Sequence, residues 1–293
     1  MRFSVIIPTL GRPQLLAETL DSVFACDPLP HEVIVVDGDP ESSARAVLDA
    51  RRLGAGATMF KYLRRGANST MQRNEGIKAA EGDVVVFLDD DVEVSRTTFA
   101  ALEKAYSDHE VVGATGHLRE PGDVRVGGAD SRLRRLLFAS SRQGTFTPFG
   151  YPHYLRSGAG EQDVEFMPGC FMTARRAVAA DVWFDEGLRG YALAEDEDFS
   201  YRLSRRGRIR YLPEIEVVHK KTGFSSLDPR TLGRLVVVNR WYLFGKNFRR
   251  TPVTVAQFAL LVGMLMGHRA LNRQWLGVVG ILEGARDVIR GRA

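Results

Sequence analysis

A chain of 293 residues with 44% hydrophobic and 26% charged residues is long enough to fold as one large domain with an appendage. This composition excludes a disordered chain, and the presence of only two cysteines excludes a disulfide-stapled mini-protein. The formal net charge of +4 is mild, and no zinc-finger spacing, RNP-like aromatic motif or basic heptad region occurs, so no nucleic acid is expected as a partner.

The first hundred residues predict alternating strands and helices. Short apolar runs rich in β-branched residues at 3–7, 33–36 and 84–88 are typical of strands buried on both faces of a parallel sheet. Between them, 13–24 and 69–80 carry apolar residues at helical spacing. The predicted fold class is therefore α/β, with a mostly parallel central sheet flanked by helices.

Polar residues follow each of the three strand-like runs. Ligands bind such sheets at the carboxyl ends of the strands, so three polar ends in succession predict a shared site. The residues at these ends are Pro8 and Thr9, then Asp37, Gly38 and Asp39, then Asp89, Asp90 and Asp91.

The acidic triplet 89–91 predicts a metal site. Three carboxylates at the open end of a buried strand repel one another unless a cation is bound between them. Carboxylate oxygens suit Mg²⁺ and Mn²⁺, which complete their shells with water and substrate phosphates. A polar turn without a ligand is the alternative, and a metal-dependent phosphatase with an aspartate nucleophile is a second enzyme class. A calcium loop of the EF-hand type is excluded because its sixth position would be Val94 instead of glycine.

After a loop-rich stretch at 117–163, a second acidic cluster stands at 195–198, directly before the helical pattern FSYRLSRRG. Acids at a helix N-terminus are favoured by the macrodipole, which explains part of the cluster without a function. A carboxylate near a metal-bound donor can also remove the proton of an acceptor hydroxyl, and we predict Asp196 as this general base. His219 ends the run IEVVH and is predicted as a third metal ligand, with a structural role as the alternative.

The C-terminal residues 230–290 are mostly helical in pattern. The apolar run 253–267 is shorter than the roughly 20 residues that span a bilayer. Basic residues flank it, so peripheral membrane contact through residues 246–273 is one prediction. A core helix or a homodimer-forming helix is the other.

Cysteine usage and the N-terminus predict the location of the protein. Cys26 and Cys170 match no zinc or redox spacing, which indicates free thiols in a reducing compartment. The opening residues MRFSVIIPTL contain no cationic leader and no cleavage site. We therefore expect a cytoplasmic protein, at the inner face of the cell membrane if the C-terminal helices bind lipid.

Taken together, several segments of the chain resemble the family 2 glycosyltransferases of the GT-A (nucleotide-diphospho-sugar transferase) fold, inverting enzymes typical of bacterial polysaccharide synthesis. The resemblance runs from residue 3 to about residue 245, in the order and approximate spacing of the family. It rests on SVIIPTLGRP, EVIVVDGD, RNEGIKAAEGDVVVFLDDDV, MPGCFMTARRAV, FDEGL, AEDEDFSYRLSRRG and YLPEIEVVH.

The resemblance implies roles for individual residues. Asp91 matches the principal metal ligand of the DXD motif, with Asp89 and His219 as further ligands of Mn²⁺ or Mg²⁺. Asp196 matches the catalytic base, with Glu195 beside it as a second catalytic residue. The residues that match the family's nucleotide-binding positions are Pro8, Thr9, Arg12, Asp37, Asn74, Asp89 and Asp90.

The resemblance also implies a domain organisation and a reaction. Residues 1–228 would form the GT-A catalytic domain, with a nucleotide-binding half at 1–115 and an acceptor half at 116–228, and 229–293 a C-terminal helical region. The reaction would be inverting transfer from a UDP-, dTDP- or GDP-linked sugar to a hydroxyl of a glycan or lipid-linked glycan in cell-surface polysaccharide synthesis. A non-catalytic glycan- or nucleotide-binding module is the third alternative, because the same fold also supports binding alone.

Overall fold

The structure, a computed structural model, describes residues 1–292 except 52–55, 120–141, 156–157, 189–191 and 221–227. The chain divides into two units. Unit 1 comprises Met1–Arg125, Arg156–Glu186 and Glu195–Thr222, and unit 2 comprises Val126–Leu155, Gly187–Ala194 and Gly223–Ala293.

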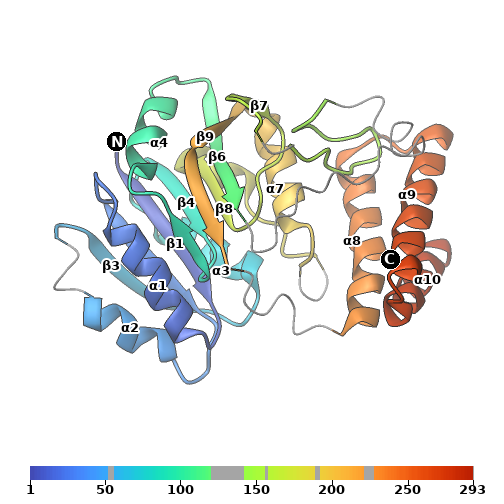
Figure 1. Ribbon diagram of the computed structural model, residues 1–293, viewed down its shortest axis with the longest axis horizontal. Helices are drawn as coiled ribbons and strands as arrows, with labels where there is room; N and C mark the ends of the chain where they lie inside the picture. Colours follow the sequence, from blue (N-terminus) through green and yellow to red (C-terminus); the bar gives the residue numbers. More distant parts are fainter. Residues whose placement is uncertain (52–55, 120–141, 156–157, 189–191, 221–227, 293) are drawn as a thin grey trace. The chain divides into compact units, whose positions relative to one another are not determined.

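Unit 1 is built on one mixed sheet with the strand order β3-β2-β1-β4-β8-β6-β9-β5, and β7 pairs with β9 outside this path (Figure 1). The pairs among β3, β2, β1 and β4 are parallel, while β8 pairs in antiparallel orientation with β4 and β6. The strands are β1 Phe3–Thr9, β2 Glu32–Asp37, β3 Met59–Arg64, β4 Val84–Leu88, β5 Val92–Val94, β6 Val111–Arg119, β7 Gln162–Val164, β8 Phe171–Arg175 and β9 Arg208–His219.

The predicted α/β class is confirmed, and the parallel pairing is concentrated in the first half of the sheet. Strands β1, β2 and β4 coincide with the three apolar runs, and every residue in them is buried. In the second half the β6–β9 pair is parallel, whereas β5 and β7 join β9 in antiparallel orientation. The sheet is therefore more evenly mixed than the apolar runs alone predict.

Helices cover both faces of the sheet because its strands alternate their side chains. Val5 and Ile7 pack with Leu16 and Leu20 of α1, whereas a Cβ at Gly76 of α3 would meet Ile6. The two predicted helices are confirmed, and the structure places them on opposite faces of the sheet. The helices of unit 1 are α1 Pro13–Phe24, α2 Ser43–Arg51, α3 Ser69–Ala79, α4 Thr98–Tyr106, α6 Arg176–Val182 and α7 Glu195–Ser204.

Among its described residues, unit 2 contains three long helices, α8 Pro229–Asn247, α9 Pro252–Leu271 and α10 Trp275–Ile289. Asp228 caps α8, and Thr251 caps α9 through a capping box with Thr254. Aromatic side chains form a core around Phe244 and Phe258, whose rings stack at a centroid distance of 5.5 Å. The helical pattern predicted for 230–290 is confirmed.

Within the part of the chain that the structure describes, one helix, α9, is long and apolar enough to cross a membrane by length and composition. The apolar run noted in the sequence is too short for this, but the helix built around it has 20 residues, or about 30 Å. Length and composition alone are weak grounds for a membrane span, since core helices of soluble proteins also meet them.

Candidate active site

The carboxyl ends of β2, β1 and β4 lie next to one another in the sheet. Thr9 at the end of β1 is in register with Asp37 at the end of β2. The side chain of Gln72 ties these ends together, since its amide donates to the carbonyl oxygens of Thr9 at 2.9 Å and Val36 at 2.7 Å. Asp37 is buried and accepts hydrogen bonds from the backbone N–H of Asp39 and, at 2.9 Å, from the hydroxyl of Tyr62.

The three aspartates after β4 do not share one environment. Asp90 has no exposed surface and points toward the loop after β1. There it accepts a hydrogen bond of 2.6 Å from the Thr9 hydroxyl and forms an ion pair with Arg12. Burial raises the pKa of Asp90 to about 6, although the Arg12 charge and the Thr9 hydrogen bond oppose the shift. Asp90 therefore holds the first loop against β4, and its own contact with a nucleotide stays a prediction.

Asp89, Asp91 and His219 form the candidate metal site. One ligand atom from each lies within 4.8 Å of the others. The sheet creates this cluster, because the strand that follows the triplet, β5, pairs with the end of β9 so that Val92 stands opposite His219. The imidazole Nε2 of His219 lies 3.3 Å from Oδ1 of Asp91, and the backbone N–H of Lys220 donates to the Asp91 carbonyl at 3.0 Å.

This donor set fits a divalent cation. Two carboxylates and one imidazole are suitable ligands for Mn²⁺, and a three-ligand set leaves positions for the phosphate oxygens of a substrate. The Asp89 side chain is 31% exposed, so the cluster is accessible from solvent. The structure thus brings together the three residues that the sequence analysis predicted as ligands, while the identity of a bound metal stays a prediction.

Arg73 of α3 is the functional candidate that the sequence analysis missed. Its guanidinium, almost fully buried, donates to Glu195 at 2.7 Å, to Asp89 at 2.9 Å and to the carbonyl of Gly169 at 3.1 Å. Burial lowers the pKa of Arg73, but the charges of Asp89, Glu195 and Asp196 outweigh it, so that the net shift is upward. A signal was present, because Arg73 lies one helical turn before the apolar, buried Ile77.

The candidate base Asp196 lies in the first turn of α7. Its Oδ2 accepts from the backbone N–H of Gly169 at 3.0 Å, and its Oδ1 accepts from the N–H of Glu197 at 2.9 Å. A Cβ at Gly169 would lie 3.2 Å from Cβ of Asp196, so this approach favours glycine. Burial raises the pKa of the neighbouring Glu195 to about 7, with Asp196 adding to the shift and Arg73 opposing it.

Arg73 therefore connects the two acidic clusters of the sequence. It bonds a member of the candidate metal site, Asp89, and the residue beside the candidate base, Glu195. A buried guanidinium can hold two carboxylates at a fixed separation through its planar donors. The predicted metal-binding and catalytic residues thus lie in one region of unit 1.

Asn74 and Arg202 have structural partners instead of facing this cluster. The amide of Asn74 donates to the Phe184 carbonyl and to Glu186, and its oxygen accepts from the Phe184 N–H at 2.8 Å. The Asn74 amide thus holds the segment 184–186 against α3. The structure therefore does not show the nucleotide contact predicted for Asn74. Arg202 pairs with Asp198 and donates to the carbonyl of Trp183 at 2.7 Å, which binds α7 to the end of α6.

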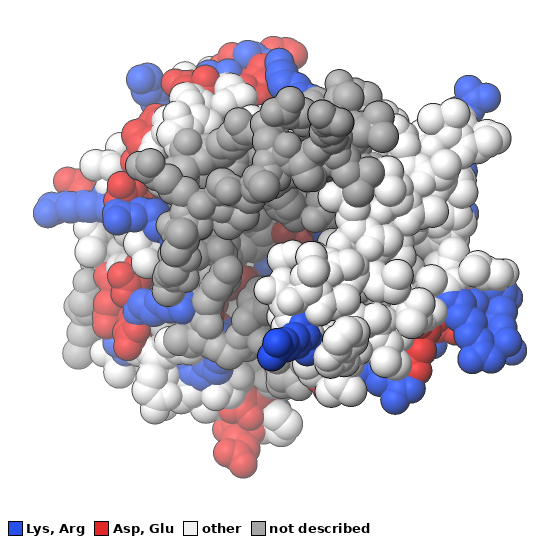
Figure 2. All heavy atoms as spheres, turned by 45° about the vertical axis from the view of Figure 1, so that its right-hand side comes forward, with Lys and Arg blue, Asp and Glu red and all other residues white. Residues whose placement is uncertain are grey.

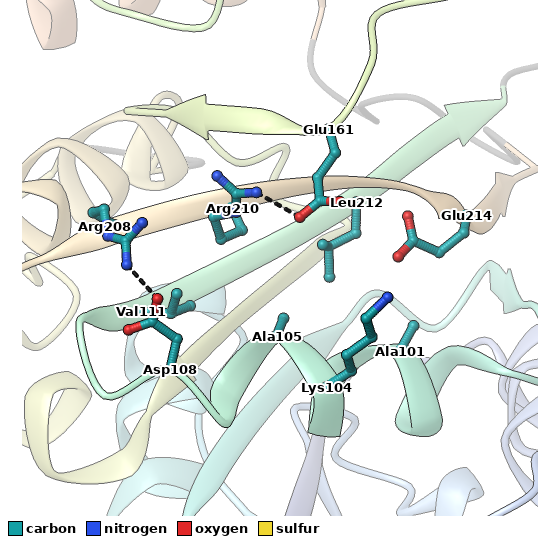
Figure 3. Close-up of a pocket in the computed structure, with 10 residues that line it drawn as sticks. All are labelled: Ala101, Lys104, Ala105, Asp108, Val111, Glu161, Arg208, Arg210, Leu212 and Glu214. Carbon is teal, nitrogen blue, oxygen red and sulfur yellow. Dashed lines mark hydrogen bonds and ion pairs between the residues drawn. The ribbon is translucent and has the colours of Figure 1, made fainter.

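A separate hollow in unit 1 lies between α4 and β9 (Figure 3). Its cationic side chains are largely neutralised, since Arg208 pairs with Asp108 and Arg210 pairs with Glu161. None of the predicted site residues lines it. Its lining residues are Ala101, Lys104, Ala105, Asp108, Val111, Glu161, Arg208, Arg210, Leu212 and Glu214.

The α/β fold of unit 1 is that of the GT-A glycosyltransferases, and comparison with known proteins agrees. The model of the family "Glycosyl transferase family 2" matches residues 4–183. Because this match covers more than half of the chain, the chain belongs to glycosyl transferase family 2. The family and the enzyme class predicted from the sequence are thereby confirmed.

Two bacterial proteins illustrate the similarity in sequence. An uncharacterized protein of Haemophilus influenzae is 34% identical over 101 residues, which is 32% of this chain and 52% of that protein. The uncharacterized glycosyltransferase YwdF of Bacillus subtilis is 28% identical over 236 residues, 75% of this chain and 74% of that one. The chain therefore spans only about half of the Haemophilus influenzae protein.

Two solved structures support the GT-A fold. S. aureus TarS 1–349 in complex with UDP-GlcNAc matches with a TM-score of 0.57 and 19% identity, over 92% of this chain and 73% of that one. The mannosyltransferase PcManGT of Pyrobaculum calidifontis, in complex with GDP-Man and Mn²⁺, matches with a TM-score of 0.62 and 16% identity, over 100% and 88%. At these identities the likeness shows the fold alone.

Proposed function

We propose that the chain is an inverting glycosyltransferase that moves a sugar from a nucleoside diphosphate donor to a hydroxyl of a glycan or lipid-linked glycan. The observation that carries the proposal is the link, through Arg73, between the cluster Asp89–Asp91–His219 and the pair Glu195–Asp196. A donor-activating centre next to a base is what displacement of a diphosphate by a hydroxyl requires. Cell-surface polysaccharide synthesis is the pathway we expect.

The donor would lie across the carboxyl ends of β1, β2 and β4. The proposed nucleotide-binding residues are Pro8, Thr9, Arg12, Asp37, Asn74, Asp89 and Asp90. Asn74 and Asp90 would act indirectly, because Asn74 holds the chain at Phe184 and Asp90 holds the loop after β1. The matched structures were solved with UDP-GlcNAc and with GDP-Man and Mn²⁺, so uridine and guanosine donors are tested first, followed by thymidine donors.

Asp89, Asp91 and His219 would hold Mn²⁺ or Mg²⁺, which supplies positive charge to the departing diphosphate. Asp196 acts as the general base: its carboxylate takes the proton of the acceptor hydroxyl as that oxygen attacks the anomeric carbon. The two backbone N–H groups that bind Asp196 fix its orientation, and a carboxylate has lone pairs left for the acceptor. The C–O bond to the diphosphate breaks as the new bond forms, so that the configuration inverts.

The first experiment measures release of free nucleoside diphosphate from UDP-, GDP- and dTDP-sugars with Mn²⁺ or Mg²⁺. We expect metal-dependent release from one class of donor, and loss of that release in Asp91→Ala. The control is Asp181→Ala, which removes an exposed carboxylate on α6 outside the site. Absence of nucleoside diphosphate release from every donor, together with release of phosphate from simple phosphoesters, would favour the phosphatase alternative. Donor binding without any turnover across an acceptor panel would favour the binding module.

The location and assembly of the protein follow from this proposal only indirectly. A cytoplasmic location at the inner membrane face would place the site near nucleotide sugars and lipid-linked acceptors. The predicted membrane contact through 246–273, the homodimer and the division into 1–228 and 229–293 remain predictions. Cell fractionation and analytical ultracentrifugation of the full chain test the first two directly.

A further inference from the structure

The C-terminal helices differ sharply in charge from the rest of the chain. Residues 228–292 contain 11 Lys and Arg but 3 Asp and Glu, a formal charge of +8, whereas the whole chain carries +4. The remainder is therefore formally −4. All three acids already have partners: Asp228 caps α8, Glu283 pairs with Arg230, and Asp287 pairs with Arg234. Such a segregated positive charge attracts anionic partners.

Glycines fix the direction in which α10 faces. A Cβ at Gly280 would overlap the carbonyl oxygen of Arg230 in α8, and a Cβ at Gly284 would lie 2.7 Å from the carbonyl oxygen of Arg234. Both glycines, with Gly277 one turn earlier, are buried. Because only this glycine face can approach α8 so closely, the opposite face of α10 must point away from α8.

That outward face of α10 is apolar. Trp275, Val279, Leu282 and Ile289 are spaced four, three and seven residues apart, which places them on one side of a helix. All four are exposed, Ile289 at 86%, and Leu271, the last residue of α9, is 87% exposed. Single exposed apolar residues are ordinary, but a continuous row of large ones marks an interaction surface. We define the α10 surface as Leu271, Trp275, Leu276, Val279, Leu282 and Ile289.

Cations lie in and beside the α10 surface. Arg286 falls within the apolar row, and Arg273 and Arg290 lie near its two ends. None of these three arginines forms an ion pair with any acid in the described part of the chain. In Figure 2 the surface of the C-terminal helices α8, α9 and α10 is mostly uncharged, and the charged side chains, mainly Lys and Arg, lie toward its edges.

The combination of apolar row and unpaired arginines decides which partner fits. A second copy in a symmetric dimer would bring the same arginines against one another, and the described residues 228–292 offer no unpaired acid to compensate them. A bilayer interface with anionic headgroups offers both an apolar layer for the row and negative charge for the guanidinium groups, and tryptophan favours that interface.

We propose that the α10 surface binds anionic lipid bilayers and thereby attaches the protein to a membrane. The surface differs from the one that the sequence predicted at 246–273. Between its two ends α9 exposes small residues, Ala256, Ala259, Gly263 and Gly267, and its large exposed apolar side chains are Val253 at the start and Leu271 at the end. The continuous row of large exposed apolar side chains lies at 271–289. The proposal does not depend on the glycosyltransferase reaction.

The test is co-sedimentation of the full chain with vesicles of phosphatidylcholine alone or mixed with phosphatidylglycerol. We expect strong recovery with the mixed vesicles, weak recovery with the neutral ones, and release by high salt. Leu282→Ser/Ile289→Ser lowers the affinity for mixed vesicles by about tenfold or more because apolar area is lost. Arg286→Gln/Arg290→Gln lowers it by about fivefold per arginine and leaves the weak neutral binding unchanged.

The matched control is Leu29→Ser/Met59→Ser, which removes two exposed apolar side chains from unit 1 and should leave recovery unchanged. Thermal unfolding of every variant checks that the fold is kept, and the arginine variant tests the proposal if the apolar variant fails to fold. Equal recovery of wild type and both α10 variants overturns the proposal, as does the absence of vesicle binding. Conversion of a dimer to a monomer by Leu282→Ser/Ile289→Ser, without a change in recovery, would instead assign the surface to a second copy.

Discussion

The acidic cluster after β4 and the acidic cluster that begins α7 have the same kind of residues in different surroundings. Asp90 and Asp91 lie in the turn between β4 and β5, which directs Asp90 inward to Thr9 while Asp89 and Asp91 converge with His219. On α7, each residue is rotated by about 100° from the last, which separates Asp196 beside Gly169 from Asp198 on Arg202.

This difference teaches why one cluster suits a cation and the other suits proton transfer. The α7 acids lie at a helix N-terminus, where the macrodipole and backbone N–H groups favour negative charge, although burial outweighs the favourable contributions at Glu195 and raises its pKa. Asp89 and Asp91 follow a strand, which has no such dipole, and they converge on an imidazole at an accessible edge. We therefore expect metal removal to affect the first cluster and base substitution to affect the second.

Substitution of the base gives the largest expected effect within this comparison. Asp196→Asn should lower turnover by about 10²–10⁴-fold, because the amide cannot accept the hydroxyl proton, while donor binding in the presence of Mn²⁺ persists. Asp91→Asn should instead weaken metal-dependent donor binding itself. Steady-state kinetics and calorimetric titration with the donor measure the two quantities. Normal turnover in Asp196→Asn would move the base to another residue, with Glu195 the next to test.

Arg73, the residue that connects the clusters, gives the second effect. Arg73→Lys keeps the charge but loses the planar fork that contacts Asp89, Glu195 and the Gly169 carbonyl, so we expect about a 10–100-fold loss of turnover and of Mn²⁺ affinity. Arg175→Lys is the matched control, because Arg175 likewise donates to three acceptors, the carbonyl oxygens of Tyr106, Asp108 and Val111, but lies outside the site.

Comparison with Arg175→Lys separates the positioning of Asp89 and Glu195 by Arg73 from a general loss of stability. Both variants should lower the unfolding temperature, but only Arg73→Lys should change Mn²⁺ affinity and the pH profile of turnover. Equal Mn²⁺ affinity in the two variants would limit Arg73 to a structural role.

The smallest effect concerns stability in the metal-free protein. The pKa of Glu195 is raised from 4.5 to about 7 by burial, so the unfolded chain releases this proton at lower pH than the folded chain does. The contribution of protonated Glu195 to the free energy of unfolding is fully present below pH 4.5 and is lost as pH rises through about 7. Glu195→Gln should remove on the order of 1–3 kcal/mol of this pH dependence.

Denaturant unfolding from pH 4 to 8 in the presence of a chelator measures this effect. A stability curve for Glu195→Gln parallel to that of the wild type would show that another group, such as Asp90 with its raised pKa, causes the pH dependence.

Local sequence patterns predicted the parts of the molecule that depend on neighbouring residues. The β-branched runs at 3–7, 33–36 and 84–88 predicted buried parallel strands, because a strand covered on both faces needs apolar residues at every position. The acids at the end of the third run predicted carboxylates at the edge of the sheet. The run IEVVH suggested His219 as a third ligand, and the resemblance to the glycosyltransferase family supported it and added nucleotide-binding positions such as Arg12 and Asn74.

Contacts between distant positions were decided by tertiary structure. The pairing of Val92 with His219 brings the imidazole to Asp91 across more than a hundred residues, and nothing local to either segment encodes that register. The position of Arg73 one turn before Ile77 indicates a buried arginine, but only packing made it the link between Asp89 and Glu195. The exposed row on α10 likewise exists because the opposite face, with Gly280 and Gly284 at the close approach, packs against α8. By itself the sequence determined the strands, the helices and the types of chemical group, since periodicity and side-chain chemistry are local properties. Which groups meet depends on packing, which is a property of the whole fold.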